Sequence, residues 1–89
     1  MDALAKAELL NRAIQILIQR AQLDDAERVE IAEFHEEWKT GKNYGSNIYL
    51  RYGLKENGRA QLYRTTRNVN PSTTPPDVPS SPQAYVKVG

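Results

Sequence analysis

Residues 48–65 read IYLRYGLKENGRAQLYRT, and this stretch decides the fold of the C-terminal half of the chain. From Ile48 to Tyr52, apolar side chains alternate with Tyr49 and Arg51, which is the period of a strand with one buried face. Asn57-Gly58 follows, and both residues tolerate the positive φ that a type I′ turn requires. Residues 61–65 then repeat the strand composition, so the sequence predicts a β-hairpin.

Toward the C-terminus, all five prolines lie between Pro71 and Pro82. Proline has no backbone N–H to donate to a sheet, so this stretch is predicted to wrap around the hairpin as an extended loop. Residues 85–88 then show the β-branched alternation of a closing edge strand. We therefore expect residues 39–89 to form a small antiparallel β module with a Pro-rich loop.

Toward the N-terminus, residues 3–21 contain strong helix formers and neither glycine nor proline, so they are predicted to be helical. At about 100° per residue, the apolar side chains of this helix cover an arc of roughly 200°. One neighbouring helix would not cover an arc of that width. The helix therefore either fills the core of its own chain or also contacts copies of itself, and the small size of the chain favours the second interpretation.

A second helix is predicted from Asp25 to Trp38, because Asp24 and Glu27 have the spacing of a capping box. Two apolar stripes run along it. The stronger contains Ile31, Phe34 and Trp38, and the weaker contains Val29 and Ala32. The two helices would form a helical hairpin, which makes the chain an α+β protein. Residues 1–38 would be a helical segment for assembly or anchoring, and residues 39–89 the β module.

The chain has 89 residues and no cysteine, so disulfides and thiolate metal sites are excluded. Chains of this size are stable by a narrow margin, and natural ones usually add disulfides, a metal or a partner chain. Association with copies of itself is therefore the expected source of extra stability. The candidate assembly surface consists of Leu10, Ile14, Leu17, Ile31 and Phe34.

Charge is distributed unevenly between the two halves. Residues 1–37 have a net charge of −5, and residues 38–89 have a net charge of +6. A basic half is a reason to consider an anionic partner, such as single-stranded nucleic acid held between arginines and aromatic rings. The arginines concerned are Arg51, Arg59, Arg64 and Arg67. The same split could equally reflect attraction between the two halves in an assembly.

Catalytic and metal motifs are not found in the sequence. His35 lacks a second histidine four residues later, where the chain has Lys39, so we expect it to lie on a solvated helix face. There is no glycine-rich phosphate loop and no nucleophile paired with a base. The sequence thus predicts a protein that is not an enzyme and holds no cofactor or metal. The apolar residues near Ile14 are too few to cross a bilayer, so no membrane span is expected.

Five of the seven aromatic residues are tyrosines, and most lie on or beside the proposed strands. Tyr52 and Tyr63 are expected to fill a thin core with their hydroxyls reaching water. For Tyr44, Tyr49 and Tyr85 both a core role and an exposed stacking role stay open. An exposed set that stacks on sugar rings would be Trp38, Tyr44, Tyr49 and Tyr85.

The stretch from Phe34 to Tyr44, FHEEWKTGKNY, resembles the entry to small modules of phage and prophage structural proteins. Further matching pieces are Leu50-Arg51-Tyr52-Gly53, Leu62-Tyr63-Arg64, Pro75-Pro76-Asp77-Val78-Pro79 and Tyr85-Val86-Lys87-Val88. The helix after Leu23-Asp24-Asp25 is similar to the leader that such proteins carry. The β module is in turn similar to chitin- and cellulose-binding modules. The chain departs from the pattern at two tryptophan positions, one of which is Tyr85.

The resemblance implies a non-enzymatic virion protein, such as a capsid decoration, a head fibre or a tail component. It would assemble in the host cytoplasm with copies of itself or with other virion proteins. Because the tryptophans typical of the sugar platform are missing, binding of chitin or cell-wall polysaccharide is the second hypothesis. Nucleic-acid binding by the basic half is the third, since the arginines are scattered.

Overall fold

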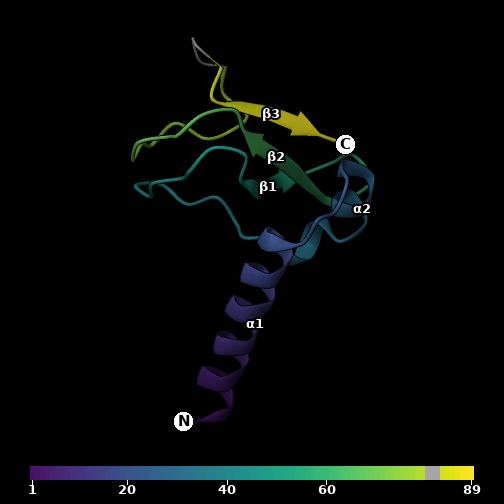
Figure 1. The fold of residues 1–89 in the computed structure, drawn as a ribbon, viewed down its shortest axis with the longest axis vertical. Helices are drawn as coiled ribbons and strands as arrows, with labels where there is room; N and C mark the ends of the chain where they lie inside the picture. Colours follow the sequence, from purple (N-terminus) through teal and green to yellow (C-terminus); the bar gives the residue numbers. More distant parts are fainter. Residues whose placement is uncertain (80–82) are drawn as a thin grey trace.

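The computed structural model describes residues 1–79 and 83–89, which extend over 44 × 27 × 26 Å. One helix, α1 (Ala3–Arg20), projects from a compact body that contains all the other elements (Figure 1). These are α2 (Asp25–Glu30), η1 (Ala32–Phe34), β1 (Tyr49–Leu54), β2 (Ala60–Thr65) and β3 (Tyr85–Val88). A helix followed by a three-stranded antiparallel sheet confirms the predicted α+β class.

The helix α1 forms where the composition predicts it. Asp2 caps its N-terminus, because a carboxylate oxygen of this residue accepts a hydrogen bond from the backbone N–H of Ala5 at 2.7 Å. The helix ends at Arg20, and Ala21 already has extended backbone angles. Since the interior has no glycine or proline, α1 runs unbroken for 18 residues.

The predicted hairpin is confirmed, but its predicted turn type is wrong. In the loop between β1 and β2, the N–H of Gly58 donates to the carbonyl of Lys55 at 2.9 Å, and the N–H of Lys55 donates to the carbonyl of Arg59 at 2.7 Å. Gly58 has a φ of 82°, whereas Asn57 has no positive φ. A type I′ turn needs two positive φ angles, so this is a three-residue loop closed by glycine.

A bulge and a short extra pairing shape β1. The register between β1 and β2 shifts after Arg51, where Gly53 takes a φ of 70°. On the outer edge of β1, the N–H of Arg51 donates to the carbonyl of Glu36 at 2.8 Å, and the N–H of Trp38 donates to the carbonyl of Arg51 at 2.9 Å. Residues 36–38 therefore cover the edge of the sheet, which would otherwise expose unpaired backbone groups.

This edge pairing explains why the second helix is shorter than predicted. The capping box at Asp24 and Glu27 is present, and α2 begins as predicted at Asp25. However, α2 ends at Glu30, one turn of 3-10 helix follows, and His35 is already extended. The prediction of a helix to Trp38 was wrong, because the backbone groups of residues 36–38 bond to β1 instead of to a preceding turn.

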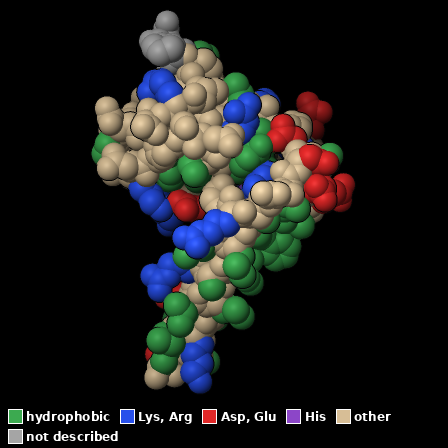
Figure 2. All heavy atoms as spheres, in the orientation of Figure 1, with side chains coloured by type: hydrophobic (Ala, Val, Ile, Leu, Met, Phe, Trp, Pro, Cys, Tyr) green, Lys and Arg blue, Asp and Glu red, His purple; other side chains and the backbone are tan. Residues whose placement is uncertain are grey.

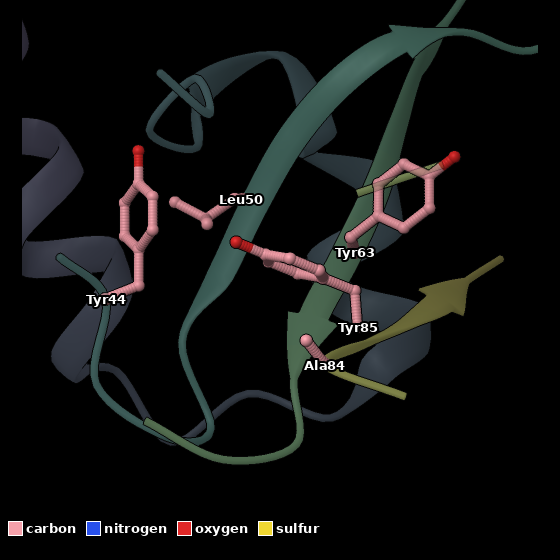
Figure 3. Packing of buried hydrophobic residues seen from close by; sticks show 5 residues of the cluster. All are labelled: Tyr44, Leu50, Tyr63, Ala84 and Tyr85. Atoms are coloured by element: carbon pink, nitrogen blue, oxygen red, sulfur yellow. The ribbon is translucent and has the colours of Figure 1, made fainter. Parts of the chain in front are cut away.

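The sheet has a different apolar cluster on each face. Side chains of paired residues point to the same face, so Leu50 and Tyr63 share one face while Leu62 and Val88 share the other. The first face carries a buried cluster drawn in Figure 3, which consists of Tyr44, Leu50, Tyr63, Ala84 and Tyr85. The second carries Ala32, Ala60, Leu62 and Val88, with Val29 and Tyr49 partly buried against them. Thus α2 and η1 pack on the second face of the sheet.

Two loops cover the first face. Tyr44 and Val69 pair through two backbone hydrogen bonds of 3.0 and 2.7 Å, so the segment before β1 lies beside the segment after β2. Residues 70–79 form no helix or strand, as expected for the Pro-rich stretch, and Pro76 is buried. The remaining residues of that predicted loop, 80–82, fall outside the part of the chain that the structure describes.

An ion pair fastens the hairpin loop to η1. Arg59 Nε donates to Glu33 Oε1 at 2.9 Å, and the guanidinium also donates to the backbone carbonyls of Val29 and Glu30. These carbonyls lie at the end of α2, where cations are favourable. The hydrogen bond from Arg59 lowers the pKa of Glu33 from 4.5 to about 2.

We expect Arg59→Gln to raise the pKa of Glu33 from about 2 toward 4.5, measured from the carboxyl ¹³C shift across a pH titration. A lowered pKa means that the ion pair stabilises the fold above pH 4.5 and that this contribution is lost as the pH falls toward 2. Lys55→Gln removes a charge from the same loop without touching Glu33 and should leave the low pKa in place. Glu33 titrating near 4.5 in the unaltered protein would contradict the pairing.

Candidate functional site: the projecting helix and its base

No residue of α1 is buried. Apolar side chains lie along the helix and continue onto the body at its base (Figure 2). The large apolar side chains of α1 that are exposed are Leu4, Leu9, Leu10, Ile16 and Leu17. Soluble monomers rarely expose large continuous apolar surfaces, and such surfaces usually mark interaction sites. The helix is therefore the strongest candidate for a functional surface in the described chain.

The structure places the five predicted assembly residues around this helix and its base. Leu10 and Leu17 on α1 are 63% and 68% exposed, and Phe34 in η1 is 54% exposed. Ile14 and Ile31 are partly buried. The set therefore spans α1, the residue after α2, and η1, which contacts α1. Leu4, Leu9 and Ile16 are also exposed and were not named as assembly residues from the sequence, although the width of the apolar arc already pointed to Leu9 and Ile16.

The C-terminal end of α1 is fixed to the body by Arg28. This arginine of α2 is 4% exposed and donates to the carbonyls of Ile18 and Ala21 at 3.1 and 2.9 Å. Its guanidinium carbon lies 4.2 Å from the centroid of the Tyr49 ring, a cation–π arrangement. Because the final carbonyls of a helix have no partner within it, a buried cation at this position satisfies them and opposes the negative end of the helix dipole.

Gln19 gives α1 a second attachment. Its side-chain amide donates to the carbonyl of Tyr49 at 2.7 Å and accepts from the N–H of Tyr49 at 3.0 Å. One side chain thus satisfies both backbone groups of a strand residue at the edge of β1. Together with the contacts of Arg28, these two hydrogen bonds set the direction in which α1 leaves the body.

His35 lies beside Arg28, and the prediction that it faces solvent was wrong. It is 1% exposed, and its Nε2 is 3.4 Å from a terminal nitrogen of Arg28. The reason is the early end of α2, since the turn at residues 32–34 rotates His35 inward toward Tyr49, whose ring centroid is 6.3 Å away. Burial lowers the pKa of His35 below 6.5, and the charge of Arg28 lowers it further.

The four residues of the predicted sugar platform do not share one exposed surface. Tyr44 and Tyr85 are buried in the cluster on the first face, and burial raises the pKa of both hydroxyls. Trp38 packs against that cluster and donates from Nε1 to the hydroxyl of Tyr85 at 3.1 Å. Tyr49 points to the opposite face, where its hydroxyl donates to Asp25. Tyr52 and Tyr63 lie on the first face, in line with the core role expected for them.

Two of the four arginines considered for nucleic acid are paired with acids of the N-terminal half. Arg51 Nε donates to the carbonyl of His35 at 2.9 Å, and its guanidinium lies 3.7 Å from Glu37. Arg59 is paired with Glu33. The basic character of this half is thus partly balanced by acids of the N-terminal half within the same chain.

Open depressions occur beside α1 and beside the Pro-rich loop. One of about 320 Å³ lies between α1 and the residues Glu36 and Ile48, and another of about 310 Å³ is bordered by Arg67, Thr74 and Tyr85. Within residues 1–79 and 83–89, no cluster of three or more histidine and acidic side chains is arranged to hold a metal ion. Over the same residues, no helix has the length and apolar character needed to span a membrane.

We compared the chain with protein-family models, curated proteins and solved structures, and none of them matches it.

Proposed function

We propose that this chain is a non-enzymatic structural protein of a phage particle, which associates with copies of itself through α1 and displays the body with its sheet. The observation that carries the self-association is that α1 buries none of its residues within its own chain. The placement in a virion rests on the motif resemblance from Phe34 to Tyr44 and at Leu62-Tyr63-Arg64.

The shape of the exposed surface favours association of several copies. At about 100° per residue, Leu9, Leu10, Ala13, Ile16 and Leu17 fall within an arc of about 120°. The apolar stripe of a helix that packs against a single partner helix is narrower than this arc. The side chain of Gln19, which binds the body, points away from the centre of this arc at the same helical period. The attachment through Gln19 therefore lies outside the contact between helices, and each α1 can meet more than one neighbour.

Sedimentation velocity of the full chain over a range of micromolar concentrations tests the self-association. We expect a species heavier than the 10.1 kDa chain, with a fraction that increases with concentration. A single, folded species of 10.1 kDa at all concentrations would overturn this part of the proposal.

The virion role needs a separate experiment, because self-association alone does not identify an assembly. Particles released from cells that encode the chain would be labelled with an antibody raised against the purified protein and with colloidal gold. We expect gold at a fixed place on the head, neck or tail of the particles. Particles that carry no label, while the protein is present in the same cells, would overturn the placement.

A further inference from the structure

The contacts of His35 determine which of its ring nitrogens carries the proton. Nδ1 lies 3.1 Å from the carbonyl of Ile31, and a carbonyl oxygen can only accept a hydrogen bond. Nδ1 must therefore carry the hydrogen. In the neutral ring Nε2 then carries no hydrogen, so it accepts a hydrogen bond from the Arg28 guanidinium, whose terminal nitrogen is 3.4 Å away. The arrangement works only while His35 is neutral.

Protonation of His35 would break this contact. A proton on Nε2 would turn the acceptor into a donor that faces another donor, and two cations would then be in contact. Arginine keeps its charge in proteins, so Arg28 cannot relieve the conflict. Its Nε is buried and has no hydrogen-bond partner among the described residues, so the guanidinium is already incompletely satisfied.

The charged groups around His35 do not compensate for a second cation. From β1, Arg51 donates to the backbone carbonyl of His35, and Tyr49 contributes a ring whose hydroxyl is bonded to Asp25. From η1, the charge of Glu33 acts on His35 and raises its pKa, but the Glu33 carboxylate is held by Arg59. From the C-terminal end of α1, the groups that face the pair are the carbonyl of Ile18 and that of Ala21, the residue after the helix, and Arg28 donates to both.

We propose that Arg28 and His35 form an acid-sensitive clamp, in which protonation of His35 releases the base of α1 while the sheet stays folded. Arg28 is the link, because the same guanidinium contacts His35 and donates to the carbonyls of Ile18 in α1 and of Ala21, the residue that follows the helix. Release would leave the two hydrogen bonds of Gln19 as the side-chain hydrogen bonds that remain between α1 and the described part of the body. The clamp does not depend on whether α1 associates with other copies.

The direction of the pH effect follows from the buried, neutral state of His35. Its pKa in the docked protein is below 6.5, so the docked state is fully favoured above pH 6.5. As the pH falls below that value, the released state binds a proton that the docked state does not. The ratio of released to docked protein should then rise by up to about tenfold per pH unit.

Two introduced cysteines would measure release directly, because the chain has none of its own. Ala5→Cys on α1 and Lys87→Cys on β3 would carry spin labels, with labelled chains diluted in unlabelled ones so that only distances within a chain are seen. We expect one narrow distance distribution at pH 8 and a broad one at pH 5. A distribution that stays narrow to pH 5 would overturn the clamp.

Two further readouts separate release from unfolding. His35 is the only histidine, so its Hε1 resonance gives its titration without ambiguity, and Trp38 is the only tryptophan and reports on the first face of the sheet. We expect the distance change to follow the His35 titration, with a midpoint below 6.5, while Trp38 fluorescence stays constant. A midpoint at or above 6.5, or a Trp38 change with the same midpoint, would overturn the proposal.

His35→Gln is the matched variant, since its amide can donate to Ile31 and accept from Arg28 but does not titrate. We expect the helix of this variant to stay docked at pH 5. Release of α1 at pH 5 in a folded His35→Gln protein would assign the effect to another group and overturn the clamp.

Discussion

Replacing Leu10 and Leu17 together with aspartate is expected to convert the associated protein into a monomer that keeps its fold. Both side chains are more than half exposed, so their loss removes little packing within the chain. In an oligomer through α1 they would be buried, and burial of one leucine contributes about 1.5–3 kcal/mol. Since about 1.4 kcal/mol is a factor of ten, we expect the dissociation constant to rise by at least about 100-fold. Sedimentation velocity measures the change, and circular dichroism checks the fold.

A matched control is available on the other flank of the same helix. Asn11→Asp with Gln15→Glu adds the same two negative charges, but at about 100° per residue these positions lie well away from Leu10 and Leu17. We expect the control to associate like the unaltered chain. An oligomer of unchanged mass in the Leu10→Asp, Leu17→Asp protein would place the association surface elsewhere.

Leu62→Ala is expected to have the largest effect on stability. Leu62 is completely buried at the centre of β2, between the partners Arg51 and Val88, and packs in the cluster beneath α2 and η1. Truncation of a buried leucine costs about 2–5 kcal/mol, because apolar contacts are lost and a cavity remains. In a chain of this length each kcal/mol corresponds to about 4–8 °C in Tm, so we expect a decrease of about 8–40 °C. Thermal unfolding followed by circular dichroism measures it.

Leu54→Ala is the control for this substitution. This substitution makes the same chemical change in the same sheet, but the Leu54 side chain is 74% exposed. Substitutions at such surface positions usually change the free energy of unfolding by less than about 0.5 kcal/mol. Equal losses of stability for Leu54→Ala and Leu62→Ala would contradict the packing of the second face.

The elements with a strong local signal were predictable from the sequence. The helix from residue 3 follows from its composition, and the strands around Leu50, Leu62 and Val86 follow from their alternation. The capping box at Asp24 correctly placed the start of α2. Each of these signals depends on residues within a few positions of one another, which is why it can be read before the chain is folded.

The sequence did not decide which stripe of the second helical segment packs within the chain. Ile31 and Phe34 of the stronger stripe are candidates for the assembly surface, and Phe34 is more than half exposed. The weaker stripe is the one that packs on the sheet, where Ala32 is 1% exposed and Val29 lies against Leu62 and its neighbours. A small side chain such as that of Ala32 allows a helical turn to approach a sheet closely. The size of the side chain at the contact therefore mattered more than the hydrophobicity of the stripe.

The sequence by itself determined an amphipathic N-terminal helix, a β-hairpin and a closing strand, since propensity and periodicity are local properties of the chain. Only the tertiary structure decided which apolar surfaces are buried within the chain and which stay exposed. It buried Tyr44 and Tyr85 on one face of the sheet, turned Tyr49 to the other, and brought Arg28 and His35 together under α1. Burial depends on which distant segments meet, and in this protein the pairing of residues 36–38 with β1 ended the second helix and left His35 turned inward.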